Sequence, residues 1–244
     1  DDPHTSTILL FLETIRKADL FAAAARRAFA AGKPVVCCMV GQSEYGRAMA
    51  SSHTGAMTGP FDATEAFLRS HGVVLVDQVG TLLEMVPFIA GRKPLQRARV
   101  AALTGTGGSA ATVVDRLGRL GVEVVPPSPQ VIETLKSRGI TISDALLTDT
   151  TMGASRTGMY NGVLSALLES DHCDIVVPVI GSNAQFDPEG AVKRVLLANP
   201  QGGKPVAVFI APEAPEAHAL LLKAGVASFR TPETCADAIR AMSQ

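Results

Sequence analysis

Short apolar runs alternate along this chain with longer amphipathic stretches, and this alternation restricts the possible folds more than any other feature. An unbroken apolar run is typical of a strand that is buried on both faces, whereas apolar residues every three or four positions are typical of a helix. Strands that alternate with helices form parallel sheets covered on both faces. The sequence therefore predicts an α/β protein built of doubly wound parallel sheets.

The first part of the chain contains three such apolar runs. We predict strands at Thr7–Glu13, Val35–Val40 and Val73–Asp77, and helices at Ala18–Ala31, Phe61–His71 and Val79–Ile89. The glycines of residues 41–59 predict a loop between the second strand and the second helix. Three strands are too few for an ordinary doubly wound sheet, so we expect this unit to lack its N-terminal strands and to expose a sheet edge.

The polar segment Gly91–Gln96, which contains Pro94, separates this unit from a second one. We place the boundary after residue 94, which gives units of residues 1–94 and 95–244. The second unit has five predicted strands, at Arg99–Leu103, Val122–Val125, Asp174–Ile180, Val206–Ala211 and Ala227–Phe229. Its predicted helices are Ala110–Leu120, Pro129–Ser137, Tyr160–Glu169, Glu189–Ala198, Pro215–Lys223 and Pro232–Met242. Five strands with helices between them make a complete flavodoxin-like domain.

Composition excludes several classes of protein and of partner. Hydrophobic residues make up 47% of the 244 residues and the net charge is −1, so the chain is globular and has no basic excess to neutralise a nucleic acid. No apolar stretch approaches the roughly 20 residues of a membrane span, and no signal peptide is visible. The four cysteines have no metal-ligand spacing and fit buried, reduced thiols. We therefore expect a cytoplasmic protein without a metal site, a nucleic-acid partner or a membrane partner.

One histidine, His53, lies among small residues in the segment 41–59. This segment follows a predicted strand, and ligands of parallel α/β sheets gather at the edge where the strands end, which we call the carboxyl edge. Glu13 ends another predicted strand at the same edge, where it could hold one ring nitrogen of His53 and leave the other free to attack. The alternatives are an ordinary loop histidine and an acid that interacts with the amides of the next turn.

A second candidate lies in the turn Thr104–Ser109, with the sequence TGTGGS, between a predicted strand and a predicted helix. Gly107, Gly108 and Ser109 would present backbone amides to an anion at the start of that helix. The pattern is neither that of a P-loop nor that of a dinucleotide-binding turn. The alternative is that the glycines serve only a tight connection between strand and helix.

Together these features resemble the NDP-forming acyl-CoA synthetase family, whose members are relatives of succinyl-CoA synthetase. The segment GQSEYGRAMASSHTGAMTG is similar to the family's Gly-Arg-Ser-Glu…Gly…Ser-His-Thr-Gly-Ala segment, which carries a phosphorylated histidine. The opening DDPHTSTILLFLE, the run KPVVCCMVG and the turn VAALTGTGGSAATVVD also match in position and order. The resemblance covers essentially the whole chain.

The resemblance implies a ligase that joins a carboxylic acid to CoA through an acyl phosphate and a phosphohistidine, at the expense of ATP. It implies that His53 carries the phosphoryl group, that Glu13 holds the imidazole, and that residues 107–109 bind phosphate. Thr54, Gly55 and Asp149 would then lie near the substrate. One departure is that the Asn-Pro pair that relatives have before Asp149 is absent here.

The resemblance also implies parts that lie outside these residues. CoA and ATP or ADP with Mg²⁺ would bind largely on a CoA-binding domain and an ATP-grasp module, in the same polypeptide or in a partner subunit. We therefore expect the isolated fragment to be inactive, and the complete enzyme to act on a small carboxylic acid as a homo-oligomer. The alternatives are a regulatory or assembly module of a larger protein, for example one fused to an acetyltransferase, and a nucleotide-binding flavodoxin-like domain, which the scarcity of aromatic residues disfavours.

Overall fold

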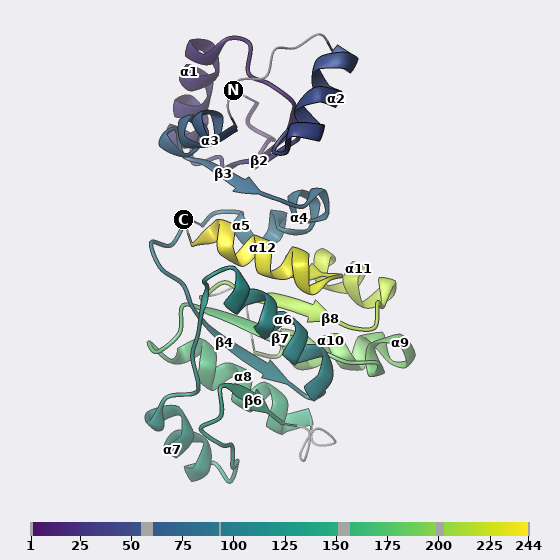
Figure 1. The fold of residues 1–244 in the computed structure, drawn as a ribbon. Coiled ribbons are helices and arrows are strands. Elements are labelled where there is room, and N and C mark those ends of the chain that lie inside the picture. The colour runs from purple at the N-terminus through teal and green to yellow at the C-terminus, as the bar shows by residue number, and fades with distance from the viewer. Residues whose placement is uncertain (1, 55–60, 93, 151–156, 199–202, 244) are drawn as a thin grey trace.

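The computed structural model describes residues 2–54, 61–92, 94–150, 157–198 and 203–243. Within these residues the strands form two parallel sheets (Figure 1). The first sheet contains β1 (Ile8–Leu12), β2 (Val35–Met39) and β3 (Val73–Val76), in that spatial order. All five residues of β2 are buried, because helices cover both faces of this central strand, and this explains its unbroken apolar sequence.

The second sheet is made of six strands from the rest of the chain. They are β4 (Arg99–Thr104), β5 (Glu123–Val124), β6 (Leu147–Asp149), β7 (Ile175–Ile180), β8 (Ala207–Ile210) and β9 (Ala227–Phe229). Their order is β5-β4-β7-β8-β9, and β6 pairs with β4 beyond the short β5. Without β6 this is the flavodoxin-like order 2-1-3-4-5, in which the winding reverses between β4 and β7. The predicted fold class is confirmed.

Helices cover both faces of each sheet, so the molecule is layered (Figure 1). The outer face of the first sheet packs against α1 (Ala18–Ala30) and α3 (Phe61–Ser70). The outer face of the second sheet carries α7 (Pro129–Ser137), α8 (Thr157–Glu169), α10 (Pro188–Leu196) and α11 (Pro215–Lys223). The short α9 (Asn183–Phe186) precedes α10. Between the sheets lie α4 (Val79–Glu84), α5 (Val86–Ile89), α6 (Gly107–Arg119) and α12 (Pro232–Met242).

The helical layer between the sheets belongs to a single hydrophobic core that reaches both of them. This core joins Val74 and Val76 of β3 to Phe229 of β9 and Ile239 of α12. The ring of Phe88 on α5 meets the ring of Phe229 edge to face, with 6.2 Å between the centroids. The two sheets are therefore packed against the same helices, although their strands do not pair with one another.

Several predictions about the elements differ from the structure. The helix predicted over Val79–Ile89 is two helices, because Pro87 lies in the first turn of α5 and cannot donate the hydrogen bond that would continue α4. The three-residue strand β6 was not predicted, since its sequence, Leu-Thr-Asp, carries no apolar run. The first turn of α6 begins at Gly107 and not at Ala110.

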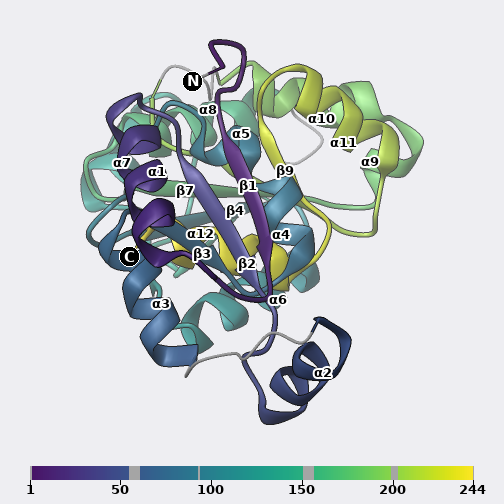
Figure 2. The ribbon, with the colours of Figure 1, turned by 90° about the horizontal axis from the view of Figure 1, so that it is seen from above.

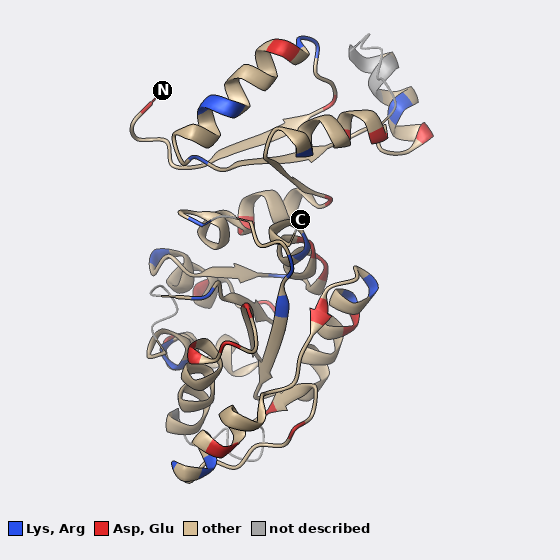
Figure 3. Ribbon diagram, turned by 90° about the vertical axis from the view of Figure 1, so that its left-hand side faces the viewer, with Lys and Arg blue, Asp and Glu red and all other residues tan. Residues whose placement is uncertain are grey.

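The four cysteines are free and buried, as predicted. Charged residues of both signs lie mainly on the helices and connections, and β1, β2 and β3 carry none (Figure 3). Among the described helices, none has the length and apolar character that crossing a bilayer demands.

Candidate functional site

The three strands of the first sheet end at one edge, and the chain that follows them carries the first candidate residues. β1 and β2 are parallel with Leu12 opposite Met39, and β2 and β3 are parallel with Cys38 opposite Val76. Glu13 directly follows β1 and is partly buried. Glu13 and the segment after β2 therefore share the carboxyl edge, as the sequence predicted.

The segment after β2 turns sharply and then forms a helix, α2 (Glu44–Thr54). Gly41 has a φ of +84°, a conformation that favours glycine. A Cβ on Gly46 would lie 3.1 Å from the Cα of Gly41, so a second glycine permits this turn to close. The hydroxyl of Ser43 accepts a hydrogen bond of 3.1 Å from the N–H of Gly46 and caps the helix. The prediction of a loop is therefore wrong for residues 44–54.

Helix α2 projects beyond the ends of β1 and β2 and stands apart from α1 and α3 (Figure 2). His53 and Thr54 lie in the last turn of this helix. Gly55 lies outside the described residues, as do the side chains of His53 and Thr54. Helix α2 starts close to the carboxyl edge that Glu13 also occupies, and His53 lies in the turn at the other end of the helix. A contact between the side chains of His53 and Glu13 stays a prediction.

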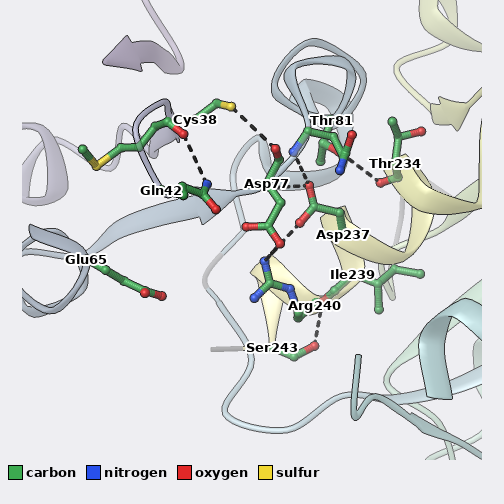
Figure 4. Close-up of polar contacts among 12 residues, drawn as sticks. Cys38, Gln42, Glu65, Asp77, Thr81, Thr234, Asp237, Ile239, Arg240 and Ser243 are labelled. Carbon is green, nitrogen blue, oxygen red and sulfur yellow. Dashed lines mark hydrogen bonds and ion pairs between the residues drawn. The ribbon is translucent and has the colours of Figure 1, made fainter. Parts of the chain in front are cut away.

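Helix α12, from the far end of the sequence, holds the neighbouring part of this edge (Figure 4). The buried carboxylate of Asp237 accepts hydrogen bonds from the backbone N–H groups of Asp77 and Gln78, where β3 ends and α4 begins. The guanidinium of Arg240 bridges the carboxylates of Asp77, at 3.0 Å, and Asp237, at 3.2 Å. Sequence reasoning missed these residues, because no local pattern shows that residues so distant in sequence meet.

The second candidate turn connects β4 to α6. The hydroxyl of Thr104 accepts a hydrogen bond of 2.8 Å from the N–H of Thr106, the N-cap residue of α6. Gly107 and Gly108 are exposed in the first turn of this 13-residue helix, where backbone N–H groups have no partner within the helix. The hydroxyl of Ser109 donates to the carbonyl of Ala211 at 3.4 Å. This geometry is that of a helix start open to an anion, and its occupation by phosphate stays a prediction.

The structure brings Asp149 to the same turn. Asp149 ends β6 and lies opposite Thr104 of β4 in the parallel register. Its Oδ2 is 3.8 Å from the position that a Cβ on Gly107 would take. A carboxylate at a helix start is favourable to the helix, but it repels a second anion there. Asp149 therefore limits the negative charge that can gather beside Gly107.

A cavity of about 340 Å³ opens between the turns that follow β4 and β7. Its walls include Gly105, Thr106, Tyr160, Gly181, Ser182 and Arg194. The two turns touch closely, since a Cβ on Gly181 would lie 2.8 Å from the Cγ2 of Thr106. This is the point at which the winding of the sheet reverses, where open α/β sheets bind ligands.

Two side chains in this cavity were not predicted from the sequence. Burial raises the pKa of Tyr160, whereas the nearby positive charge of Arg194 opposes that rise. The hydroxyl of Tyr160 stays protonated and donates to the carbonyl of Val179 at 3.4 Å. The cavity thus combines a neutral hydroxyl with a cation and suits a small polar or anionic group. Neither residue belongs to a motif, so no signal in the sequence pointed to them.

The carboxyl edges of both sheets face the same side of the molecule, since the arrows of β3, β4 and β8 all point to the right in Figure 1. The two glycine-bearing segments, one after β2 and one after β4, therefore open towards a common side. Among the described residues, no group of three or more His, Cys, Asp or Glu side chains could hold a metal ion.

Comparisons with known proteins show which proteins this chain is similar to. The family model described as the succinyl-CoA ligase like flavodoxin domain matches residues 1–89. A trans-feruloyl-CoA synthase from an unknown prokaryotic organism is 30% identical over 192 residues, which cover 77% of this chain and 26% of that protein. The alpha subunit of an ADP-forming acetate–CoA ligase II from Pyrococcus furiosus is 30% identical over 254 residues, covering 100% of this chain and 54% of that subunit.

A solved structure shows the same arrangement of both sheets. It is the dinucleotide forming acetyl-coenzyme A synthetase 1 of Ca. Korarchaeum cryptofilum in complex with phosphate and ADP. The TM-score is 0.79 at 25% sequence identity, over 99% of this chain and 53% of that one. The chain therefore spans about half the length of these archaeal relatives and about a quarter of the synthase.

Proposed function

We propose, from the premise that this chain belongs to the NDP-forming acyl-CoA synthetase family, that it is the phosphoryl-transfer part of an acid–CoA ligase. The observation that carries the proposal is the placement of Glu13 and of α2, the helix whose last turn contains His53. They follow neighbouring parallel strands and so share one carboxyl edge. An imidazole and a carboxylate at one sheet edge are the parts that a phosphohistidine carrier needs.

In this mechanism a ring nitrogen of His53 attacks the phosphorus of an acyl phosphate. The N–P bond forms as the bond from phosphorus to the acyl oxygen breaks, and the carboxylic acid leaves as its carboxylate. A β-phosphate oxygen of ADP then attacks the same phosphorus, the N–P bond breaks and ATP forms. Run in reverse, and followed by attack of the CoA thiol on the acyl phosphate with release of phosphate, these steps make the CoA ester. The carboxylate of Glu13 accepts a hydrogen bond from the N–H of the other ring nitrogen and so fixes the tautomer that attacks.

The start of α6 supplies the electrostatic part of the proposal. The exposed amides of Gly107 and Gly108, together with the dipole of α6, would stabilise the charge on the phosphoryl group during transfer. Ser109 would fix this turn through its bond to the carbonyl of Ala211. The carboxylate of Asp149 would repel an anion bound at this turn, so it would favour phosphoryl groups that also accept hydrogen bonds from other groups.

The cavity between β4 and β7 is the proposed place of the acyl group. It adjoins Thr106 at the start of α6, so an acid held there has its carboxylate beside the phosphate-binding amides. Its volume of about 340 Å³ suits a small acid. Thr54 and Gly55, next to His53 in the sequence, complete the proposed substrate contacts.

The complete enzyme needs parts that this chain does not span. We propose that CoA and ATP or ADP with Mg²⁺ bind to a CoA-binding domain and an ATP-grasp module, in the same polypeptide or in a partner subunit. The remaining proposals are that the isolated chain does not turn over and that the complete enzyme is a cytoplasmic homo-oligomer.

Phosphorylation of the complete protein tests the assignment directly. Incubation with ATP labelled at the γ-phosphate should give a phosphoprotein that is labile to acid and stable to base, as phosphohistidine is. His53→Ala should abolish the label, while His172→Ala, at an exposed turn, should keep it. Labelling of His53→Ala at the parent level would remove His53 from the mechanism.

A second pair of variants tests the carboxylate. Glu13→Gln should lower the rate of labelling by about 10- to 100-fold, because the imidazole loses the group that orients it. Glu133→Gln, at an exposed position of α7, is the matched control and should label like the parent. If neither parent nor variants take up label although acyl-CoA binds, the chain is a regulatory module and the ligase proposal fails.

A further inference from the structure

We propose that a cavity at the amino edge of the first sheet, where its strands begin, binds a small amphiphilic carboxylate. The cavity has a volume of about 440 Å³ and lies at the edge opposite to the one that carries α2. It is therefore distinct from the site described above. The proposal does not depend on the chemistry assigned to His53.

The walls of the cavity are mostly apolar. They are formed by Ala25 and Phe29 of α1, Val74 of β3 and Ile89 of α5. Ala25, Val74 and Ile89 are buried, whereas Phe29 is 67% exposed. The ring of Phe29 lies over Gly72, since a Cβ at that glycine would be 3.4 Å from its Cδ2. An exposed aromatic ring beside a cavity with an apolar floor is typical of a ligand site.

One charged group in the cavity has unused capacity for hydrogen bonds. The guanidinium of Arg92 lines the cavity, and its Nη1 donates only to the carbonyl oxygens of Pro87, at 3.3 Å, and Phe88, at 3.4 Å. Both bonds are long for N–H···O contacts. Within the described part of the chain, no carboxylate lies within 4.0 Å of this guanidinium. Burial lowers the pKa of Arg92, because the charged guanidinium has lost part of its contact with water. A bound anion would stabilise that charge.

The cavity has a second cation. Lys33 also lines it, and its Nζ donates to the carbonyl oxygen of Asp2. Of the two cations, Arg92 has the geometry that selects the ligand. Its planar fork of N–H donors matches a carboxylate, which can accept two parallel hydrogen bonds. An apolar body against Phe29 and Val74 with a carboxylate at Arg92 satisfies both kinds of surface, and a cation of the same length does not.

Methyl-selective NMR of the 244-residue chain, with octanoate as the probe, tests the proposal. Octanoate should shift the methyl signals of Val74 and Ile89 in a saturable way, whereas octylammonium should leave them in place. Arg92→Gln should weaken octanoate binding by about tenfold or more, the effect of losing a charge-assisted hydrogen bond. Phe29→Ala should weaken it by about tenfold through lost apolar contact.

Two further variants separate binding from folding. Arg92→Lys keeps the charge but not the fork, so its affinity should lie between those of the parent and Arg92→Gln. Arg138→Gln, at the exposed end of α7, should bind octanoate like the parent. Equal binding of octanoate and octylammonium, shifts confined to other methyl groups, or unchanged affinity in a folded Arg92→Gln chain would each overturn the proposal. None of these results bears on the labelling of His53.

Discussion

The carboxylate of Asp237 accepts a hydrogen bond of 2.9 Å from the backbone N–H of Asp77, which lies 160 residues earlier in the chain. The same oxygen accepts a second bond, of 3.0 Å, from the N–H of Gln78. These N–H groups lie in the turn that joins β3 to α4, since Asp77 follows the last residue of β3 and Gln78 is the N-cap residue of α4. Helix α12 thus holds this turn in place beside the carboxyl edge of the first sheet.

Asp237→Ala should lower the free energy of unfolding by about 1–3 kcal/mol, because two backbone amides lose their carboxylate acceptor and Arg240 loses one of its carboxylates. Urea denaturation followed by circular dichroism measures the change. Asp144→Ala, at an exposed position without such contacts among those described, should change it by less than about 0.5 kcal/mol. Equal effects of the two substitutions would show that the bonds of Asp237 contribute nothing to stability.

His218 should make the protein less stable in mild acid. Burial lowers the pKa of His218 from its ordinary value of 6.5, and the charge of Arg230 lowers it further, while Glu84 and Glu213 oppose the shift. Its Nδ1 lies 2.8 Å from the hydroxyl oxygen of Ser228, and its buried Nε2 has no hydrogen-bond partner among the described residues. As the pH falls below 6.5, His218 therefore takes up a proton in the unfolded chain but stays neutral in the folded chain.

Urea denaturation over a series of pH values measures this effect. The free energy of unfolding should fall with pH below 6.5, and His218 should contribute a slope of up to about one proton. His218→Gln should remove this part of the slope, while His172→Gln, at an exposed position, should retain it. A pH profile of His218→Gln identical to that of the parent would contradict the assignment.

The close approach of two turns at the second sheet can be tested with a methyl group. Gly181→Ala should lower the free energy of unfolding by about 1–3 kcal/mol, because the added Cβ would lie 2.8 Å from the Cγ2 of Thr106. Combining it with Thr106→Ser removes that Cγ2 and should recover part of the loss. Thermal or urea denaturation of the single and double variants gives the coupling. Strict additivity would mean that these two residues do not touch.

The glycines at the start of α6 separate a structural role from a binding role. A Cβ on Gly108 would meet no atom within 4 Å, so Gly108→Ala should change the free energy of unfolding by less than about 0.5 kcal/mol. If phosphate approaches this backbone, the same methyl group should lower the rate of phosphohistidine labelling by about 10- to 100-fold.

Gly118→Ala in the same helix is the matched control. Its Cβ also has open space, so it should raise stability by about 0.5–1 kcal/mol and leave labelling unchanged. Parental labelling rates in Gly108→Ala would place the phosphoryl group elsewhere.

The strands of this fold could be predicted because the apolar runs that mark them are short and continuous. The runs at 7–13, 35–40 and 73–77 contain β1, β2 and β3, and no predicted strand end differs from the observed one by more than one residue. Helix α2 could not be predicted, because Gly41 and Gly46 indicate a loop when only local preference is considered. In the structure these glycines form the turn that starts the helix.

The same distinction applies to the candidate sites. Glu13 could be placed at a carboxyl edge, since it directly follows a strand that the sequence predicted. The position of Asp149 could not be predicted, because the strand that it ends, β6, carries no apolar run. Tyr160, Arg194 and Asp237 could not be placed, because long-range packing of α8, α10 and α12 brings them to their positions. Sequence periodicity specifies which face of a helix is buried but not which distant strand that face covers.

The helical layer that both sheets share has a consequence for how the chain folds during synthesis. Helix α12 is synthesised after every strand of both sheets, yet its residues Cys235, Ile239 and Met242 belong to the core that the inner face of the first sheet also lines. While the ribosome is still producing the second half, that inner face has only part of its final cover. We therefore expect the nascent first half to expose apolar surface and to be open to proteases until α12 emerges, and we expect removal of α12 to destabilise both halves.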